Sequence, residues 1–120
     1  MGAEKMTWNE RNAISPHSEY LYQKAREKAD SGEYEHAIEM LHEAVEHSPK
    51  NYHALCELGN CHDYMSRYED AVSYYDKVIT LDPFNADAWF NKGMSLKKMG
   101  RENEAATCIE RSIDLYFGRA

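Results

Sequence analysis

Residues 52–85 read YHALCELGNCHDYMSRYEDAVSYYDKVITLDPFN, and the fold can be predicted from the pattern of this stretch. In its first half, apolar residues recur at three- and four-residue spacing, as at Leu55 and Leu58. The same spacing returns in the second half, as at Ala71 and Tyr75. Because a helix brings residues at this spacing onto one face, the stretch predicts two amphipathic helices separated by a short break.

The same pattern occurs on both sides of this stretch, without an insertion. A shift of 34 residues aligns residues 18–51 with residues 52–85, and these with residues 86–119. The best-matched columns are Leu21/Leu55/Trp89, Ala25/Gly59/Gly93, Gly32/Ser66/Gly100, Ala37/Ala71/Ala105, Leu41/Tyr75/Ile109 and Pro49/Pro83. We therefore predict three tandem copies, each of which folds as a hairpin of two helices.

The columns also predict where helices begin, end and touch. Small residues on both helices of a copy let the two backbones approach closely. Glycine or serine after the first helix tolerates the left-handed conformation that closes a helix. Asn51 and Asn85 stand where the next copy's first helix needs an N-terminal cap, and Ser15 and Pro16 are typical of the cap and first residue of the opening helix.

In these residues, from Ser18 to about Leu115, the chain resembles the tetratricopeptide repeat family. The matching motifs are Leu55-x-x-Leu58-Gly59-x-x-His62 with Ala71-x-x-x-Tyr75 and Pro83, and Trp89-x-x-Lys92-Gly93-x-x-Leu96 with Ala105-x-x-x-Ile109. The departures are Lys24 and Lys28, where the family usually has Leu and Tyr, and Phe117, where proline would stand.

The resemblance implies an all-α, right-handed superhelical solenoid of three antiparallel helix-turn-helix hairpins. We expect residues 1–15 to be an N-terminal extension and residues 16–120 to be the repeat domain, with repeats at 18–51, 52–85 and 86–119.

The resemblance further implies a concave groove, lined by the first helix of each copy, that binds a peptide segment or domain of another protein. Among the predicted groove residues, Tyr22, Phe90 and Met94 offer apolar contact. The side-chain amides of Asn60 and Asn91 can hydrogen-bond a peptide backbone. An ordinary solvated helix face is the alternative. The predicted groove residues are Tyr22, Gln23, Arg26, His53, Cys56, Glu57, Asn60, Asp87, Phe90, Asn91 and Met94.

One subtype of the family, the co-chaperones that clamp the C-terminal carboxylate of heat-shock chaperones, uses lysine, asparagine and arginine in its groove. The positions that match here hold Tyr22, Arg26, Glu57, Asp87 and Asn91. Because Glu57 and Asp87 would repel a carboxylate, we expect no binding of an acidic C-terminal chaperone tail.

Composition and charge narrow the function classes. Twenty-one acidic and 14 basic residues give a formal net charge of −7, which repels phosphate backbones, so no nucleic-acid partner is expected. No apolar run approaches the ~20 residues of a membrane span, so no membrane partner is expected. Three cysteines without framework spacing, and no recognisable signal peptide, favour reduced thiols in a cytoplasmic protein.

The middle repeat holds the residues that most resemble a chemical site: His53, Cys56, Cys61 and His62. His53 and Cys56 share one helix face, but the other two point toward the packing side, so the four ligands cannot converge on one ion. Catalysis would need a cysteine held by an oriented base in a pocket, which nothing in the sequence marks. We predict no metal, no cofactor and no enzymatic activity.

The last helix carries apolar residues that no further copy covers: Ile109, Ile113, Tyr116 and Phe117. Such a patch is typical of an interface. The alternative function is therefore a structural or assembly subunit that associates through the ends of the array, with weak self-association. A fragment boundary and fraying of the last helix are competing explanations.

Three apolar residues near the N-terminus, Met6, Trp8 and Ile14, have no place in the repeat. They could cover the first helix, occupy the groove of their own chain, or belong to a flexible tail.

Overall fold

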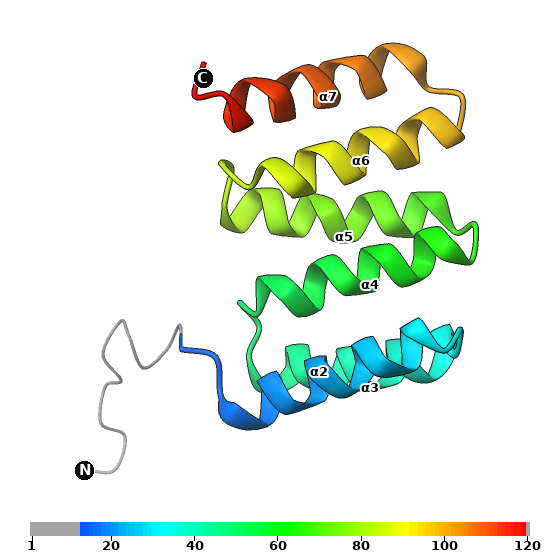
Figure 1. The fold of residues 1–120 in the computed structure, drawn as a ribbon, viewed down its shortest axis with the longest axis vertical. Coiled ribbons are helices and arrows are strands. Elements are labelled where there is room, and N and C mark those ends of the chain that lie inside the picture. The colour runs from blue at the N-terminus through cyan, green and yellow to red at the C-terminus, as the bar shows by residue number, and fades with distance from the viewer. Residues whose placement is uncertain (1–12, 120) are drawn as a thin grey trace.

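The computed structural model describes residues 13–119, and in this range the chain forms six helices and no strand (Figure 1). Met6 and Trp8 lie outside the described residues. None of these helices combines the length and the apolar character needed to cross a membrane. The helices are α2 (Pro16–Asp30), α3 (Tyr34–His47), α4 (Tyr52–Tyr64), α5 (Tyr68–Leu81), α6 (Ala86–Lys98) and α7 (Glu102–Tyr116).

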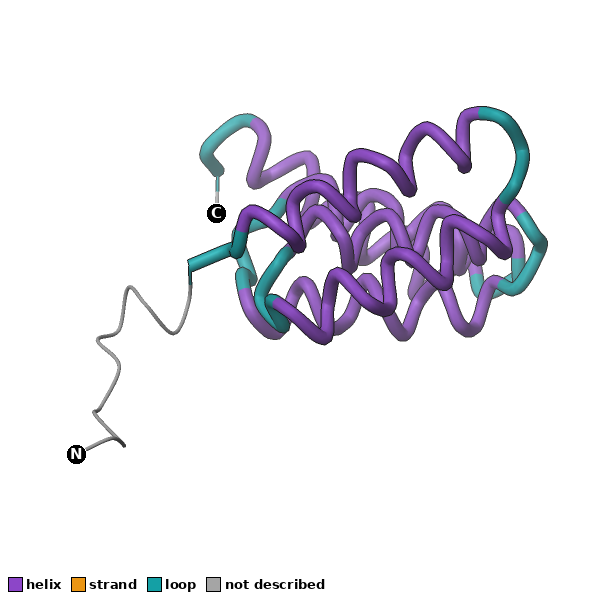
Figure 2. The backbone as a smooth tube through the Cα atoms, turned by 90° about the horizontal axis from the view of Figure 1, so that it is seen from below, coloured by secondary structure: helices purple, strands orange, loops and turns teal. Residues whose placement is uncertain are grey.

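Successive helices pack as three antiparallel hairpins, α2 with α3, α4 with α5 and α6 with α7. The hairpins stack in chain order (Figure 1), through contacts of α3 with α4 and of α5 with α6, and α2 also contacts α4. Seen from below, the helices run nearly side by side and their connecting loops gather at two ends (Figure 2). The predicted all-α fold of helical hairpins is confirmed.

A residue in the left-handed conformation closes the first helix of each hairpin, as predicted. The φ angles are 83° at Gly32, 62° at Ser66 and 80° at Gly100. Ser66 is the single non-glycine residue with positive φ in the described part of the chain. This conformation returns the next N–H to the end of the helix, as where Arg67 donates to the carbonyl of His62 at 2.8 Å.

The predicted N-terminal caps are also present. The Oδ1 atoms of Asn51 and Asn85 accept hydrogen bonds from the backbone N–H three residues ahead, at 3.1 and 3.0 Å. Ser15 caps α2 in the same way through its Oγ atom, at 3.0 Å, and Pro16 is the first residue of that helix. Each first helix of a hairpin therefore begins where its sequence signal stands.

Small residues let the two helices of a hairpin approach closely. A Cβ atom added to Gly59 would lie 2.5 Å from Cε1 of Tyr75, and one added to Gly93 would lie 2.7 Å from Cγ1 of Ile109. Ala25, which fills this column in the first repeat, is fully buried. The predicted packing role of the column is confirmed.

Three of the four apolar side chains singled out at the end of the last helix are exposed. The exposed fractions are 39% for Ile113, 57% for Tyr116 and 72% for Phe117, whereas Ile109 is half-buried toward α6. The Tyr116 hydroxyl donates to the carboxylate of Asp87, so this side chain is tied to α6 although it is exposed.

Candidate functional site

The first helices of the three hairpins border two adjacent hollows, to which α3 and α5 add one tyrosine each. The first hollow, of about 360 Å³, is lined by Arg26, Ala29, Asp30, Tyr34, Glu57, Asn60 and Tyr64. The second, of about 250 Å³, is lined by Asn60, Asp63, Tyr64, Tyr75, Asn91, Met94 and Lys98. Because Asn60 and Tyr64 border both, we treat the two hollows together as the groove.

The sequence predicted part of this lining. Arg26, Glu57, Asn60, Asn91 and Met94 line the groove, so the structure brings these five predicted residues together. The other predicted residues, all within the described range, lie outside both hollows: Tyr22, Gln23, His53, Cys56, Asp87 and Phe90.

Two of the residues outside the hollows form a small aromatic patch with a groove residue. The rings of Tyr22 and His53 are 5.6 Å apart between centroids, and the guanidinium of Arg26 lies 5.9 Å from the Tyr22 ring. Gln23 is engaged on its own helix, where its amide donates to Glu19 at 2.9 Å. Because Arg26 also lines the first hollow, the patch of Tyr22, His53 and Arg26 extends that lining toward the beginning of α4.

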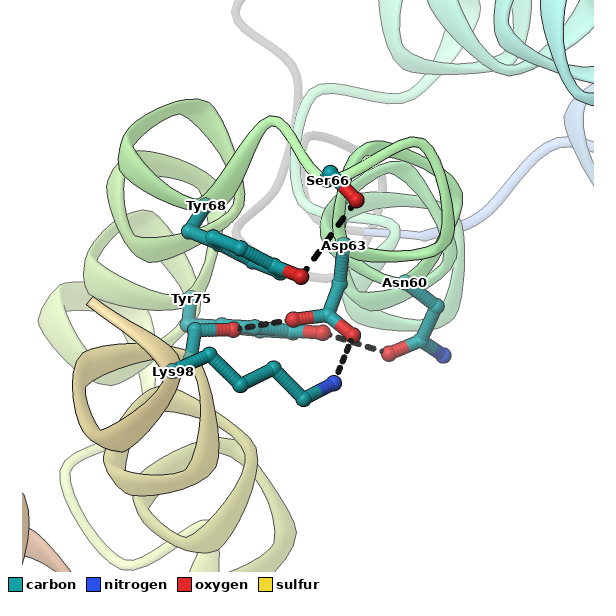
Figure 3. A network of polar contacts seen from close by, with 7 residues as sticks. Asn60, Asp63, Ser66, Tyr68, Tyr75 and Lys98 are labelled. Atoms are coloured by element: carbon teal, nitrogen blue, oxygen red, sulfur yellow. Dashed lines mark hydrogen bonds and ion pairs between the residues drawn. The ribbon is translucent and has the colours of Figure 1, made fainter. Parts of the chain in front are cut away.

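Asn60 stands where the two hollows meet, and the protein itself orients its amide. The Tyr75 hydroxyl donates to Asn60 Oδ1 at 2.6 Å (Figure 3), and Asn60 Nδ2 donates to Glu57 Oε1 at 3.3 Å. The Tyr75 ring fits because Gly59 has no side chain. Burial raises the pKa of Tyr75, so its hydroxyl remains a donor. Within residues 13–119 the second N–H of the Asn60 amide has no hydrogen-bond partner, so it is available to an external acceptor.

Asp63 links the second and third hairpins beside the second hollow. Its carboxylate accepts from Lys98 Nζ at 2.7 Å (Figure 3), and it also accepts from Ser95 Oγ at 2.7 Å. The hydrogen bond to Asp63 raises the pKa of Lys98, so the lysine stays charged and the two charges cancel. Since the Lys98 side chain is 44% exposed, the pair orients the lining more than it stabilises the fold.

Sequence reasoning missed the aromatic part of the groove. The rings of Tyr34 and Tyr64 stack, with centroids 5.3 Å apart and an interplanar angle of 11°. Tyr64 follows Asn60 by four residues, so helical spacing was a signal for it. Tyr34 comes from the second helix of another hairpin, and Tyr75 stands in a column of the repeat that predicts packing, so neither residue signals a groove position within one repeat.

The cysteines beside the groove are not activated. Burial, assisted by the carboxylates of Asp87 and Glu57, raises the pKa of Cys56 to about 11. Burial likewise raises the pKa of Cys61 to about 12. Both thiols are protonated at neutral pH, and a protonated thiol is a poor nucleophile and a poor metal ligand.

The chain is similar in sequence to known repeat proteins. Three sequence models described as tetratricopeptide repeat match residues 22–63, 52–85 and 74–107. An uncharacterized protein of Methanocaldococcus jannaschii is 37% identical over 73 residues, which cover 61% of this chain and 80% of that protein.

Solved structures give the same result for the fold. The Sgt2 TPR domain from Aspergillus fumigatus superposes with a TM-score of 0.83 at 22% identity, over 87% of this chain and 69% of that chain. The second TPR of Spaghetti (RPAP3), bound to the HSP90 peptide SRMEEVD, gives 0.79 at 21% identity, over 83% and 93%. At such identities the similarity shows a shared helical-repeat fold and nothing more.

Proposed function

Because the chain belongs to the tetratricopeptide repeat family, we propose that it is a protein-interaction module whose groove binds a peptide segment of another protein without catalysis. The second hollow carries the proposal, since Asn60 and Asn91 from neighbouring repeats line one space together with Met94. Amide side chains can pair with the N–H and C=O groups of an extended peptide, and methionine accepts varied apolar side chains.

The size and charge of the hollows support a peptide ligand over a small molecule. Volumes of about 360 and 250 Å³ lie at or below the lower end of small-molecule pockets, and they suit single side chains of a peptide. In the first hollow the one positive charge, on Arg26, lies beside two carboxylates, those of Asp30 and Glu57. In the second hollow the ammonium group of Lys98 balances the negative charge of Asp63. The groove therefore favours a neutral or basic segment.

The test is to select peptides from a displayed library on the full chain and to compare variants by calorimetric titration. Asn91→Ala and Met94→Ala should each weaken the selected peptide about tenfold, because each removes a contact made only in the complex. Asn103→Ala, an exposed asparagine on α7 that lines neither hollow, is the matched control and should bind as the unchanged chain does. Asn60→Ala is unsuitable because it strands the Tyr75 hydroxyl.

Equal affinity of all variants for the selected peptide would contradict binding in the groove.

The second candidate function is that of an assembly subunit, which self-associates through the exposed end of α7. The 72% exposure of Phe117 favours it. Under that function Phe117→Ser would abolish a concentration-dependent increase in sedimentation coefficient, and Asn91→Ala would leave it intact.

We also propose that acidic C-terminal chaperone tails are not ligands. The peptide SRMEEVD, held by the RPAP3 repeat, should show no saturable binding up to about 1 mM, because Glu57 and Asp87 stand at two of the positions where carboxylate-clamping relatives carry lysine, asparagine or arginine. Fluorescence anisotropy of the labelled peptide measures this directly. Replacing both acids, as Glu57→Asn with Asp87→Lys, should produce measurable binding, whereas micromolar binding to the unchanged chain would refute the exclusion.

A further inference from the structure

Among residues 13–119, one group of potential metal ligands converges, and it lies outside the groove on the first hairpin. His17 is in the first turn of α2, and Glu43 and His47 are in the last two turns of α3. One ligand atom from each side chain lies within 4.8 Å of the other two. The three side chains are exposed, so an ion can reach them.

The separations between the ligand atoms of these side chains approach those found around a bound metal ion. Two ligand atoms bound to a tetrahedral zinc ion at ordinary bond lengths are about 3.4 Å apart. His17 Nε2 and Glu43 Oε2 are 3.6 Å apart, and the imidazoles of His17 and His47 meet edge to face with centroids 4.5 Å apart. Glu43 and His47 are four residues apart and therefore share one face of α3. Because no two of the three ligand atoms are more than 4.8 Å apart, the exposed side chains have to close each separation by about 1.4 Å at most.

Short hydrogen bonds fix the backbone beneath this cluster. The N–H of Ser15 donates to Ser48 Oγ at 2.9 Å, and the buried hydroxyl of Ser18 donates to the carbonyl of Ala44 at 2.7 Å. Ser15 and Ser18 flank His17 in the sequence, Ala44 follows Glu43, and Ser48 follows His47 at the end of α3. Because the two helices are already joined here, ion binding has to order only the exposed side chains, which lowers its entropic cost.

We propose that His17, Glu43 and His47 bind one divalent transition-metal ion, of which Zn²⁺ suits two imidazoles and a carboxylate best. Water completes the coordination. No sequence motif predicts this site, because its ligands come from two helices. An ion at this position joins the beginning of α2 to the end of α3, so it stabilises the first hairpin.

The experiment uses the full chain, carrying no polyhistidine tag, titrated with Zn²⁺ by calorimetry. We expect one ion per chain with micromolar affinity, and at a hundredfold excess over the dissociation constant an increase in Tm of about 10 °C. His17→Ala and His47→Ala should each weaken uptake at least tenfold. His36→Ala is the matched control. His36 is exposed, and its Nδ1 atom lies 3.9 Å from Glu33 Oε1, so it forms a histidine–carboxylate pair like that of His17 and Glu43.

Cobalt provides a second readout of the ligands. The Co²⁺ complex should show ligand-field bands without the near-ultraviolet bands of thiolate ligation. Thiolate bands, uptake unchanged in both histidine variants, or no saturable uptake would each overturn the proposal. Circular dichroism checks that the variants are folded. If an alanine variant loses helix, Glu43→Gln replaces it as the test, because this substitution keeps the shape of the side chain. Glu43→Gln should also weaken zinc uptake at least tenfold.

Discussion

Gly59→Ala is expected to lower the free energy of unfolding by about 2 kcal/mol, although alanine favours a helix over glycine by roughly 1 kcal/mol. The new Cβ atom would lie 2.5 Å from the ring of Tyr75, closer than carbon atoms can approach. Tyr75 is 2% exposed and its hydroxyl is bonded to Asn60, so both burial and this hydrogen bond oppose a movement of the ring. Thermal unfolding should show Tm lower by about 8 °C.

The first repeat supplies the rescue for this variant. Its residues in the same two columns are Ala25 and Leu41, both fully buried in one core. Gly59→Ala combined with Tyr75→Leu copies that pair into the second repeat, so most of the lost stability should return. The double-mutant cycle should give a coupling energy of about 1–2 kcal/mol. Additive losses would show that the glycine is needed for some reason other than the volume of Tyr75.

The same double variant separates stability from binding. Tyr75→Leu removes the hydroxyl that orients Asn60 in the groove. A folded chain with this pair should therefore bind the selected peptide more weakly than the unchanged chain, because the Asn60 amide is no longer held in one orientation.

What the sequence predicted well is local to one repeat. The column of Gly32, Ser66 and Gly100 fixes the helix ends, because a left-handed residue closes a helix whatever lies around it. Asn51 and Asn85 cap the helices that follow them for an equally local reason. Such signals need only the spacing along one chain segment.

What the sequence did not predict are side-chain contacts between helices. Asp63 meets Ser95 and Lys98 across a repeat junction, 32 and 35 residues away, and Tyr34 meets Tyr64 across another. The rotation of one hairpin on the next decides these contacts, and a pattern of 34 residues does not encode that rotation. The groove lining was therefore only partly predicted.

The largest effect of a single polar change is expected for Asn51→Ala, with a loss of about 3 kcal/mol in the free energy of unfolding. Asn51 is fully buried, and its Oδ1 atom accepts the N–H of Ala54. Its Nδ2 donates at 3.0 Å to Ser18 Oγ, which in turn donates to the carbonyl of Ala44. Removing the amide leaves the buried N–H of Ala54 without its acceptor and the buried Ser18 hydroxyl without the donor from α4.

Asn85→Ala is the matched control, with an expected loss of about 1 kcal/mol. Asn85 makes the same cap on α6, but it is half-buried, and the columns of the repeat place Tyr52 rather than a serine at the position equivalent to Ser18. Urea unfolding followed by circular dichroism measures both losses. Because neighbouring repeats are coupled only through their junctions, Asn51→Ala should also speed amide hydrogen exchange in α2 and α3 before α6 and α7. Equal losses in the two variants would mean that the first junction depends on apolar packing and not on this buried network.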